Sequence, residues 1–386
     1  MRKNTTGASR GIYKVIRGIL TAAAAVLCAI FTVHLLPTLV MGTGFTLDMG
    51  AATGTNAAIM DRYDTYMTNT LSDALDGVVA IRKTYWLSDE DMIAPEPNPD
   101  CYGETEDPAS LQWLLDKAER MLGVTDTLFT TETVIKPGSK VVYYLDETIF
   151  TVTWKEVINN SVYTMSEVKI AHASQFRRFL ADGTYGSEKQ YYTTEMAETV
   201  NAVTASSGDF YKFRGMGVIV CNGEVQRANY YLDVCYIDDQ GDLLFTRAGE
   251  MKTVEEAQAF VDENNIRFSL AFGPVLVDNY EKATPAYYQL GEPDRNYSRA
   301  ALAQLGELHY LLVAVNYDGY GAVPTIYRLA DQMVAFGVEK AYALDGGQTA
   351  TIVTNDTLFN KPDYGTQRKI SDIIYFATAI PSEEWE

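Results

Sequence analysis

Residues 141–154, VVYYLDETIFTVTW, and residues 162–172, VYTMSEVKIAH, decide the fold class. Aromatic and β-branched side chains alternate with polar ones in both runs, which is typical of β-strands with one buried face. Amphipathic segments at 194–203, 253–264 and 325–336 interrupt the later strand-like runs. We therefore predict an α+β (mixed α/β) domain of roughly 250 residues, with a largely antiparallel mixed sheet and flanking helices.

Local signals place the ends of these elements. Asn222-Gly223 predicts a tight hairpin, and residues 239–242 predict a second turn. A capping box opens the segment 253–264. A further helix is predicted to begin at Asp107-Pro108 and to end at Gly123.

The N-terminal region predicts a membrane anchor. The 24 residues from Gly18 to Met41 carry no formal charge, and a helix of that length reaches roughly 36 Å, enough to cross a bilayer. The run is longer than the apolar part of most cleaved signal peptides, so we favour a retained transmembrane helix. Five basic residues precede it. They predict a single-pass protein of the cell membrane, with a cytoplasmic N-terminus and an extracytoplasmic C-terminal domain.

These features divide the chain into four parts. Residues 1–17 form a basic cytoplasmic tail and residues 18–41 the anchor. Residues 42–130 form a stalk or helical N-terminal region, because Gly-, Thr- and Pro-rich stretches interrupt it. Residues 131–386 form the main domain.

Charge excludes one class of partner. The 386 residues include 51 acidic and 31 basic ones, a formal charge of −20. Removing the five basic residues before the anchor leaves 26 basic against 51 acidic residues, or −25, for the part after residue 47. Such a domain repels nucleic acid. An anionic substrate would need a local cluster of basic side chains, and the oligomeric state is not predicted.

The cysteine and histidine contents argue against a disulfide framework and against a histidine-based metal centre. Three of the four cysteines lie outside the anchor, and this odd number cannot form a complete disulfide framework. Cys221 and Cys235 could pair across a hairpin, but we favour ordinary buried thiols. With three histidines in the chain and no Cys-x-x-Cys pair, we expect no structural zinc site, no histidine-based metal centre and no cofactor, while a metal site made of aspartates alone stays open.

The strongest local candidate for chemistry is AYALDGGQT, residues 341–349. An apolar strand ends there at Asp345, and the glycines that follow allow a tight turn with amides that an anion can use. An ordinary Asp-Gly turn is the alternative.

Two further segments bring polar groups to the ends of predicted strands. Asp209 follows the small residues at 204–208, and Arg299 precedes an apolar run and is suited to gripping an anion. Ser207 lacks the Gly-x-Ser-x-Gly context of a nucleophile, so we do not expect a serine triad.

Several blocks occur in a fixed order across residues 162–380: GDFY, FGPVLV, SRAALAQ, LDGGQTATIV, and Gln367-Arg368 before SDIIYFATAI. This succession resembles the phosphodiester glycosidase family. That family includes an N-acetylglucosamine-1-phosphodiester α-N-acetylglucosaminidase and many bacterial exported proteins. Ser207 and Asp209 replace the usual Asn and Gly of the first block, Ser298 replaces the Pro before Arg299, and Gln348-Thr349 replaces Gly-Ser.

The resemblance implies a hydrolase that cleaves a sugar-1-phosphodiester, with residues 131–386 as the catalytic domain. A carboxylate would attack the anomeric carbon or activate water, for which Asp345 and Asp209 are the candidates. The substrate-binding candidates are Arg299 and Arg368 for the phosphate, with Ser207, Gly346, Gly347, Gln348 and Thr349 as hydrogen-bond partners.

The sequence is compatible with two functions. The first is a membrane-anchored, exported glycosidase that acts on a surface or wall glycan. The second is a non-catalytic glycan-binding or envelope-scaffold protein of the same fold, which the replacements at Ser207 and Gln348 favour. A metal-dependent nuclease is a weaker third, because no histidines accompany the carboxylates.

Overall fold

The computed structural model describes residues 85–88, 92–129, 140–283, 293–318 and 321–385. The predicted tail at 1–17, the anchor at 18–41 and the first part of the 42–130 region lie outside these residues. No helix within the described ranges has the length and apolar character to cross a membrane. Residues 84–386 form one compact unit.

The largest sheet has nine strands, and every pair of neighbouring strands in it is antiparallel. In spatial order it contains β1 (Tyr102–Thr105), β2 (Val141–Leu145), β3 (Ile149–Ile158), β4 (Ser161–Ile170), β15 (His309–Asn316), β14 (Arg299–Gly306), β16 (Lys340–Leu344), β12 (Val275–Asp278) and β13 (Glu281–Lys282).

Two five-stranded antiparallel sheets accompany it. One contains β10 (Leu243–Thr246), β9 (Val234–Asp238), β11 (Ile266–Leu270), β7 (Ile219–Cys221) and β8 (Glu224–Arg227). The other contains β18 (Thr357–Leu358), β17 (Ile352–Thr354), β6 (Thr204–Ser207), β19 (Asp372–Phe376) and β5 (Phe176–Leu180). The described helices are α4 (Pro108–Leu122), α5 (Thr193–Thr199), α6 (Val254–Glu263) and α7 (Ile326–Ala335).

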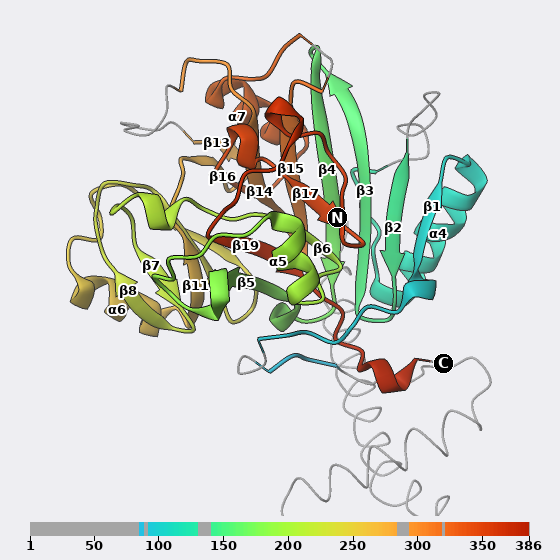
Figure 1. Cartoon of the computed structure of the whole chain (residues 1–386), viewed down its shortest axis with the longest axis horizontal. Coiled ribbons are helices and arrows are strands. Elements are labelled where there is room, and N and C mark those ends of the chain that lie inside the picture. The colour runs from blue at the N-terminus through green and yellow to red at the C-terminus, as the bar shows by residue number, and fades with distance from the viewer. Residues whose placement is uncertain (1–84, 89–91, 130–139, 284–292, 319–320, 386) are drawn as a thin grey trace, which may run out of the picture. The chain divides into compact units, whose positions relative to one another are not determined.

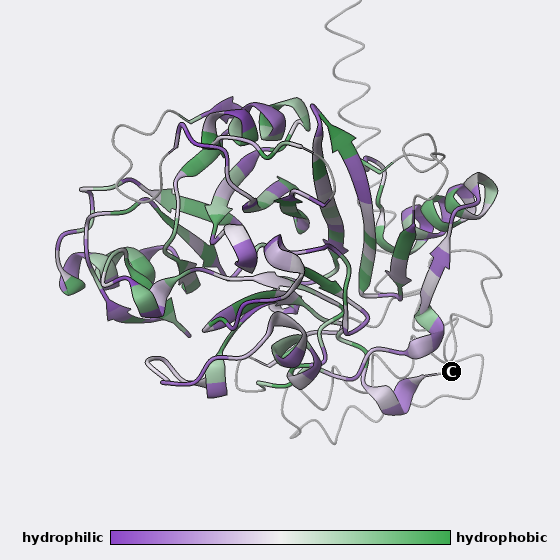
Figure 2. Cartoon of the chain, turned by 45° about the horizontal axis from the view of Figure 1, so that its top comes forward, coloured by the Kyte–Doolittle hydropathy of each residue, from purple (hydrophilic) through white to green (hydrophobic). Residues whose placement is uncertain are grey.

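The strands bury side chains on both faces of the main sheet, and this produces four layers. Helices α4 and α7 cover one face, where Leu111 and Met333 belong to the same buried cluster as Val313 of β15. Both small sheets pack against the other face. Their outer faces are covered by α5 and α6 (Figure 1). Hydrophobic and hydrophilic residues alternate along the long strands of the main sheet (Figure 2). The predicted α+β architecture is confirmed, because helices flank antiparallel sheets.

The predicted helix ends are largely confirmed. Asp107 caps α4 by accepting a hydrogen bond from the Ser110 amide, and Gly123 ends the helix at φ 68°. The capping box that opens α6 is present. Helix α5 is shorter than the predicted 194–203 segment and ends at Thr199. Asn201 adopts φ 56°, and the chain then enters β6, whose pairing with β17 and β19 replaces helical hydrogen bonds.

The predicted hairpins also form. β7 and β8 flank Asn222-Gly223, and β9 and β10 flank residues 239–242. The thiols of Cys221 and Cys235 are free. They lie on strands that are not neighbours, because β11 pairs with both β7 and β9 and lies between them.

Candidate active site

Asp345 stands at the end of a buried central strand, as predicted. It follows Leu344, the last residue of β16, and β16 is hydrogen-bonded to β14 on one side and β12 on the other. Asp345 is half-buried, whereas the four residues before it are buried. Strands on both sides therefore fix the backbone that carries this carboxylate.

The turn after Asp345 is tied to the start of β14. Gly346 lies so close to the Ser298 carbonyl that a Cβ atom there would overlap it. Gly347 adopts φ 65°, and its amide donates to the Ser298 carbonyl at 2.7 Å. The Thr349 hydroxyl donates to the Gly346 carbonyl at 2.6 Å. The Gly347 amide is thus used within the protein, so it does not supply the anion contact expected from the sequence.

Burial raises the pKa of Asp345 to about 6. A hydrogen bond from Thr349 and the positive charges of Arg214 and Arg368 oppose this shift, and the negative charge of Asp209 adds to it. Because removal from water penalises the ionised form, the raised pKa is a sign that desolvation outweighs two nearby arginines. Carboxylates with such perturbed pKa values are concentrated at functional sites.

Two arginines share one aromatic ring next to Asp345. The guanidinium carbon of Arg214 lies 5.1 Å from the Phe210 ring centre and 4.7 Å from that of Phe272. The guanidinium carbon of Arg368 lies 5.8 Å from the Phe210 ring centre. Cation–π contact holds both planar groups against the ring. Asp345, Arg214 and Arg368 together carry one net positive charge, which suits an anion.

Asp209 belongs to a buried ion-pair network beneath Asp345. One carboxylate oxygen of Asp209 accepts from Arg178 at 3.0 Å and from the Tyr211 amide, and the other accepts from the Ala271 amide at 2.7 Å. The side chain of Asp209 has no exposed surface. Its oxygens are therefore occupied inside the protein, and its geometry fits a supporting role.

Arg178 also pairs with Asp372. The two side chains are 2.8 Å apart and equally buried, and Arg178 donates in addition to the Ser269 carbonyl. Burial raises the pKa of Asp372 to about 7, although the Arg178 charge opposes this. We name Arg178, Asp209 and Asp372 the buried triad.

The buried triad supports the Asp345 turn through Gly208. The Gly208 amide donates to the Asp372 carbonyl at 3.0 Å, and the Gly208 carbonyl accepts from the Asp345 amide at 3.4 Å. A Cβ atom on Gly208 would overlap the Asp372 carboxylate. This close packing links strands from two sheets directly behind the candidate active site.

The remaining predicted residues divide into two groups. Arg299 is buried, donates to the carbonyls of Arg295 and Pro324, and lies 5.3 Å from the Tyr297 ring centre. Substrate binding by Arg299 stays a prediction. Gln348 donates to the Thr366 carbonyl at 3.1 Å, and Ser207 ends β6 with its hydroxyl buried beside Gly208. The structure brings Ser207, Gly346, Gly347, Thr349 and Arg368 around the end of β16.

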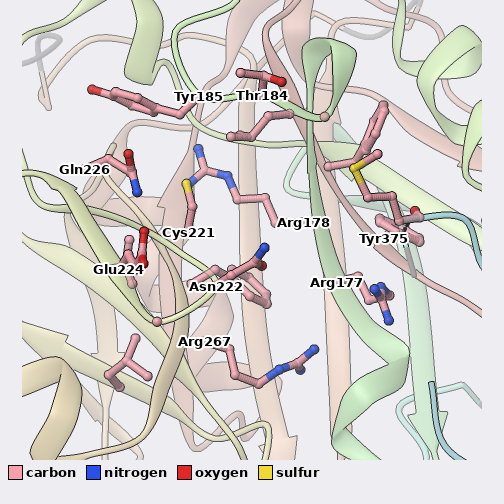
Figure 3. A pocket seen from close by; sticks show the side chains of 18 of the residues that line it. Arg177, Arg178, Thr184, Tyr185, Cys221, Asn222, Glu224, Gln226, Arg267 and Tyr375 are labelled. Carbon is pink, nitrogen blue, oxygen red and sulfur yellow. Dashed lines mark hydrogen bonds between the residues drawn. The ribbon is translucent and has the colours of Figure 1, made fainter. Parts of the chain in front are cut away.

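A separate cavity of about 670 Å³ borders β5, β7 and β11. Figure 3 shows the Arg178 side chain beside Cys221 in this cavity, with Arg177 and Arg267 below it in the view. Arg178 thus has this cavity on one side and the two carboxylates of the buried triad on the other. Asp345 does not line the cavity.

Within the described ranges, no group of three His, Cys, Asp or Glu side chains is arranged to hold a metal ion. Sequence reasoning missed Arg214, the buried Arg178 and Asp372. Arg214 lies in a loop without a motif, and the only signal was its position four residues after Phe210 of the GDFY block.

Residues 200–377 match the sequence model of a family described as phosphodiester glycosidase. This part of the chain is a phosphodiester glycosidase domain. The match contains Asp209, Arg214, Asp345, Arg368 and Asp372, and it confirms the resemblance predicted from the sequence. Domains of this family are hydrolases that act on phosphodiester glycosides.

Solved structures give weaker similarities to this phosphodiester glycosidase domain. A hypothetical protein from Synechocystis has 14% identity and a TM-score of 0.49, over 62% of this chain and 64% of that one, less than two thirds of its length. The catalytic domain of zebrafish N-acetylglucosamine-1-phosphodiester α-N-acetylglucosaminidase, auto-inhibited by its pro-peptide, has 17% identity and a TM-score of 0.47, over 60% and 82% of the two chains. No curated protein matches the chain.

Proposed function

We propose that this chain is a membrane-anchored, exported glycosidase that hydrolyses a sugar-1-phosphodiester within a surface or wall glycan. The observation that carries the proposal is the half-buried Asp345 at a rigid strand end, beside Arg214 and Arg368. The uncharged run at 18–41 and the basic residues before it support the anchor and its orientation. The glycan itself is proposed from the family match.

The proposed reaction breaks the bond between the anomeric carbon and the phosphate oxygen. The ionised Asp345 attacks that carbon or removes a proton from the attacking water, and the electron pair of the broken bond goes to the phosphate. Water supplies a hydroxyl to the sugar and a proton to the released phosphate monoester. Because phosphate is a good leaving group, charge neutralisation matters more than a strong acid.

Arg214 and Arg368 form the proposed phosphate clamp. A guanidinium group can donate two parallel hydrogen bonds to phosphate oxygens, and the Phe210 ring holds both groups in place. The proposed clamp contains Arg214, which the sequence did not predict, beside the predicted Arg368. Phosphate binding by Arg299, whose guanidinium group donates to backbone carbonyls, stays a prediction.

Removing either clamp charge should weaken catalysis. We expect Arg214→Met and Arg368→Met each to lower kcat/KM by about 100-fold, since each removes a donor to the developing phosphate charge. Lys369→Met is the matched control, because Lys369 is the next residue and lies over Tyr192 instead. Equal kcat/KM values for Arg368→Met and Lys369→Met would contradict the clamp.

The pH profile tests whether the ionised form of Asp345 acts. Since its pKa is raised to about 6, Asp345 is a carboxylate above that pH and protonated below it. We expect kcat/KM for the methyl phosphodiester of N-acetylglucosamine 1-phosphate to be constant above about pH 7, and to fall about tenfold per pH unit below about pH 5. The amount of sugar released per unit time measures the rate at each pH.

The control for this profile is Asp372→Asn, which removes a nearby buried carboxyl whose pKa is also raised, to about 7, and should leave the inflection near pH 6. A rate that increases as the pH falls below 6 would show that protonated Asp345 is the active form. Glycan binding without any sugar release would instead support the non-catalytic alternative.

A further inference from the structure

A second hollow, of about 500 Å³, lies beside the loop that leads to Arg368. Tyr317 at the end of β15 and Tyr364 in the loop contribute aromatic rings to it. Asp318, Lys361 and Asp363 contribute charged groups. We name it the tyrosine hollow.

Neither tyrosine side chain packs in the hydrophobic core. Tyr364 is 91% exposed and Tyr317 is 46% exposed. Tyr364 also adopts φ 63°, a conformation that is unfavourable for a large side chain. What distinguishes these two exposed rings is that both line the same hollow, where they are available to contact a ligand.

The polar groups of the tyrosine hollow are held in fixed positions. Asp318 pairs with Lys155 at 2.8 Å, and Asp363 accepts a hydrogen bond from the Ser298 hydroxyl at 2.6 Å. Fixed carboxylates accept hydrogen bonds from hydroxyl groups, and aromatic faces attract the weakly positive C–H face of a sugar ring. The two carboxylates outnumber the one lysine of the lining, so the hollow suits a neutral sugar unit better than a phosphate.

The tyrosine hollow adjoins the candidate active site. Ser298 contacts both, because its hydroxyl donates to Asp363 and its carbonyl accepts from Gly347. Gln348 donates to Thr366, the residue after Gly365 of the hollow. Arg368 follows Gly365 by three residues, so their Cα atoms are at most about 11 Å apart. A short oligosaccharide can span that distance.

We infer that the tyrosine hollow is a sugar-binding subsite, and that the substrate is an oligosaccharide or polysaccharide in which neutral sugar units adjoin the cleaved phosphodiester. This inference rests on the proposed function and deepens it. Tyr364 and Tyr317 stack on a sugar unit, while Asp318 and Asp363 bind its hydroxyl groups.

The test compares short and long substrates with the full chain. The short probes are the methyl phosphodiesters of N-acetylglucosamine 1-phosphate and glucose 1-phosphate, and the long probes carry a trisaccharide in place of the methyl group or on the sugar. We expect at least one long probe to have a KM about tenfold below that of its short counterpart. Tyr364→Ala and Tyr317→Ala should each remove most of this advantage and leave kcat/KM for the short probe unchanged.

Tyr280→Ala is the matched control, because Tyr280 is also exposed and adopts φ 64° on the turn between β12 and β13. Tyr364→Phe keeps the ring and should behave as the native chain. Equal effects of Tyr364→Ala on short and long probes, or no effect on either, would overturn the subsite while leaving the hydrolase intact.

A binding measurement separates failure of the subsite from failure of the proposed function. If no probe is hydrolysed, the proposed function fails, and calorimetric titration of the long probes then decides the subsite alone. Binding that Tyr364→Ala weakens at least fivefold, and that Tyr280→Ala does not change, supports the subsite. Undetectable binding, or equal binding by both variants, overturns it.

Discussion

Asp345→Asn should reduce sugar release by about 1,000-fold or more, since the variant retains the shape of the side chain but cannot attack carbon or accept a proton. Substrate should still bind, because Arg214 and Arg368 remain. Hydrolysis of the methyl phosphodiester and calorimetric binding of the same compound measure the two effects. Asp356→Asn, on the turn between β17 and β18, is the control carboxylate. Full activity in Asp345→Asn would remove the catalytic assignment.

The same variant should remain folded, and its pH dependence gives an independent check. The pKa of Asp345 is about 6 in the folded chain, above its ordinary value of 3.8. The folded state therefore binds the proton more tightly, so this residue lowers stability as the pH increases from about 4 to about 6, and the loss persists above that range. The Asp345→Asn variant has no carboxyl group to ionise at this position and does not lose this stability. Its Tm at pH 8 should therefore equal or exceed that of the native chain. A lower Tm at pH 8 would mean that the ionised carboxylate stabilises the fold.

Arg178→Met should destabilise the chain by about 3–5 kcal/mol, because it leaves Asp209 and Asp372 buried without their common partner. Urea denaturation measures the loss. The triple variant Arg178→Met, Asp209→Asn, Asp372→Asn should recover much of it, since no buried charge remains uncompensated.

Lys140→Met is the matched control for Arg178→Met. The ion pair between Lys140 and Glu104 is shorter than those of Arg178, at 2.6 Å, but both side chains are more than half exposed. Solvent screens such a pair, so we expect a change of at most about 1 kcal/mol. A similar small change for Arg178→Met would show that the buried triad does not hold the fold together.

Much of the architecture follows from the sequence. Alternation along residues 141–172 predicts β3 and β4, and capping residues predict α4 and α6. The strand that ends at Asp345 and the turn after it are also predictable, because the apolar run and the glycines are contiguous. The sequence overestimates the C-terminal extent of helix α5, because the pairing of β6 with distant strands overrides the local helical preference.

The partners of individual site residues are less predictable. Asp209 looks like a candidate nucleophile in isolation, but Arg178 from β5 and Ala271 after β11 occupy its oxygens. Arg299 occupies the expected strand start, yet its guanidinium group donates to carbonyls of two loops. Both outcomes depend on contacts between segments far apart in the chain, and a local pattern does not contain that information.

The close approach of Gly346 to Ser298 has a consequence for evolution. A descendant that loses catalysis is released from any requirement for a carboxylate at position 345, but the turn after β16 still has to pass close to the Ser298 carbonyl at the start of β14. We therefore expect Gly346 to outlast Asp345 in degenerate copies of this gene, so a glycine without the preceding aspartate would mark a domain that retains the fold but is no longer an enzyme.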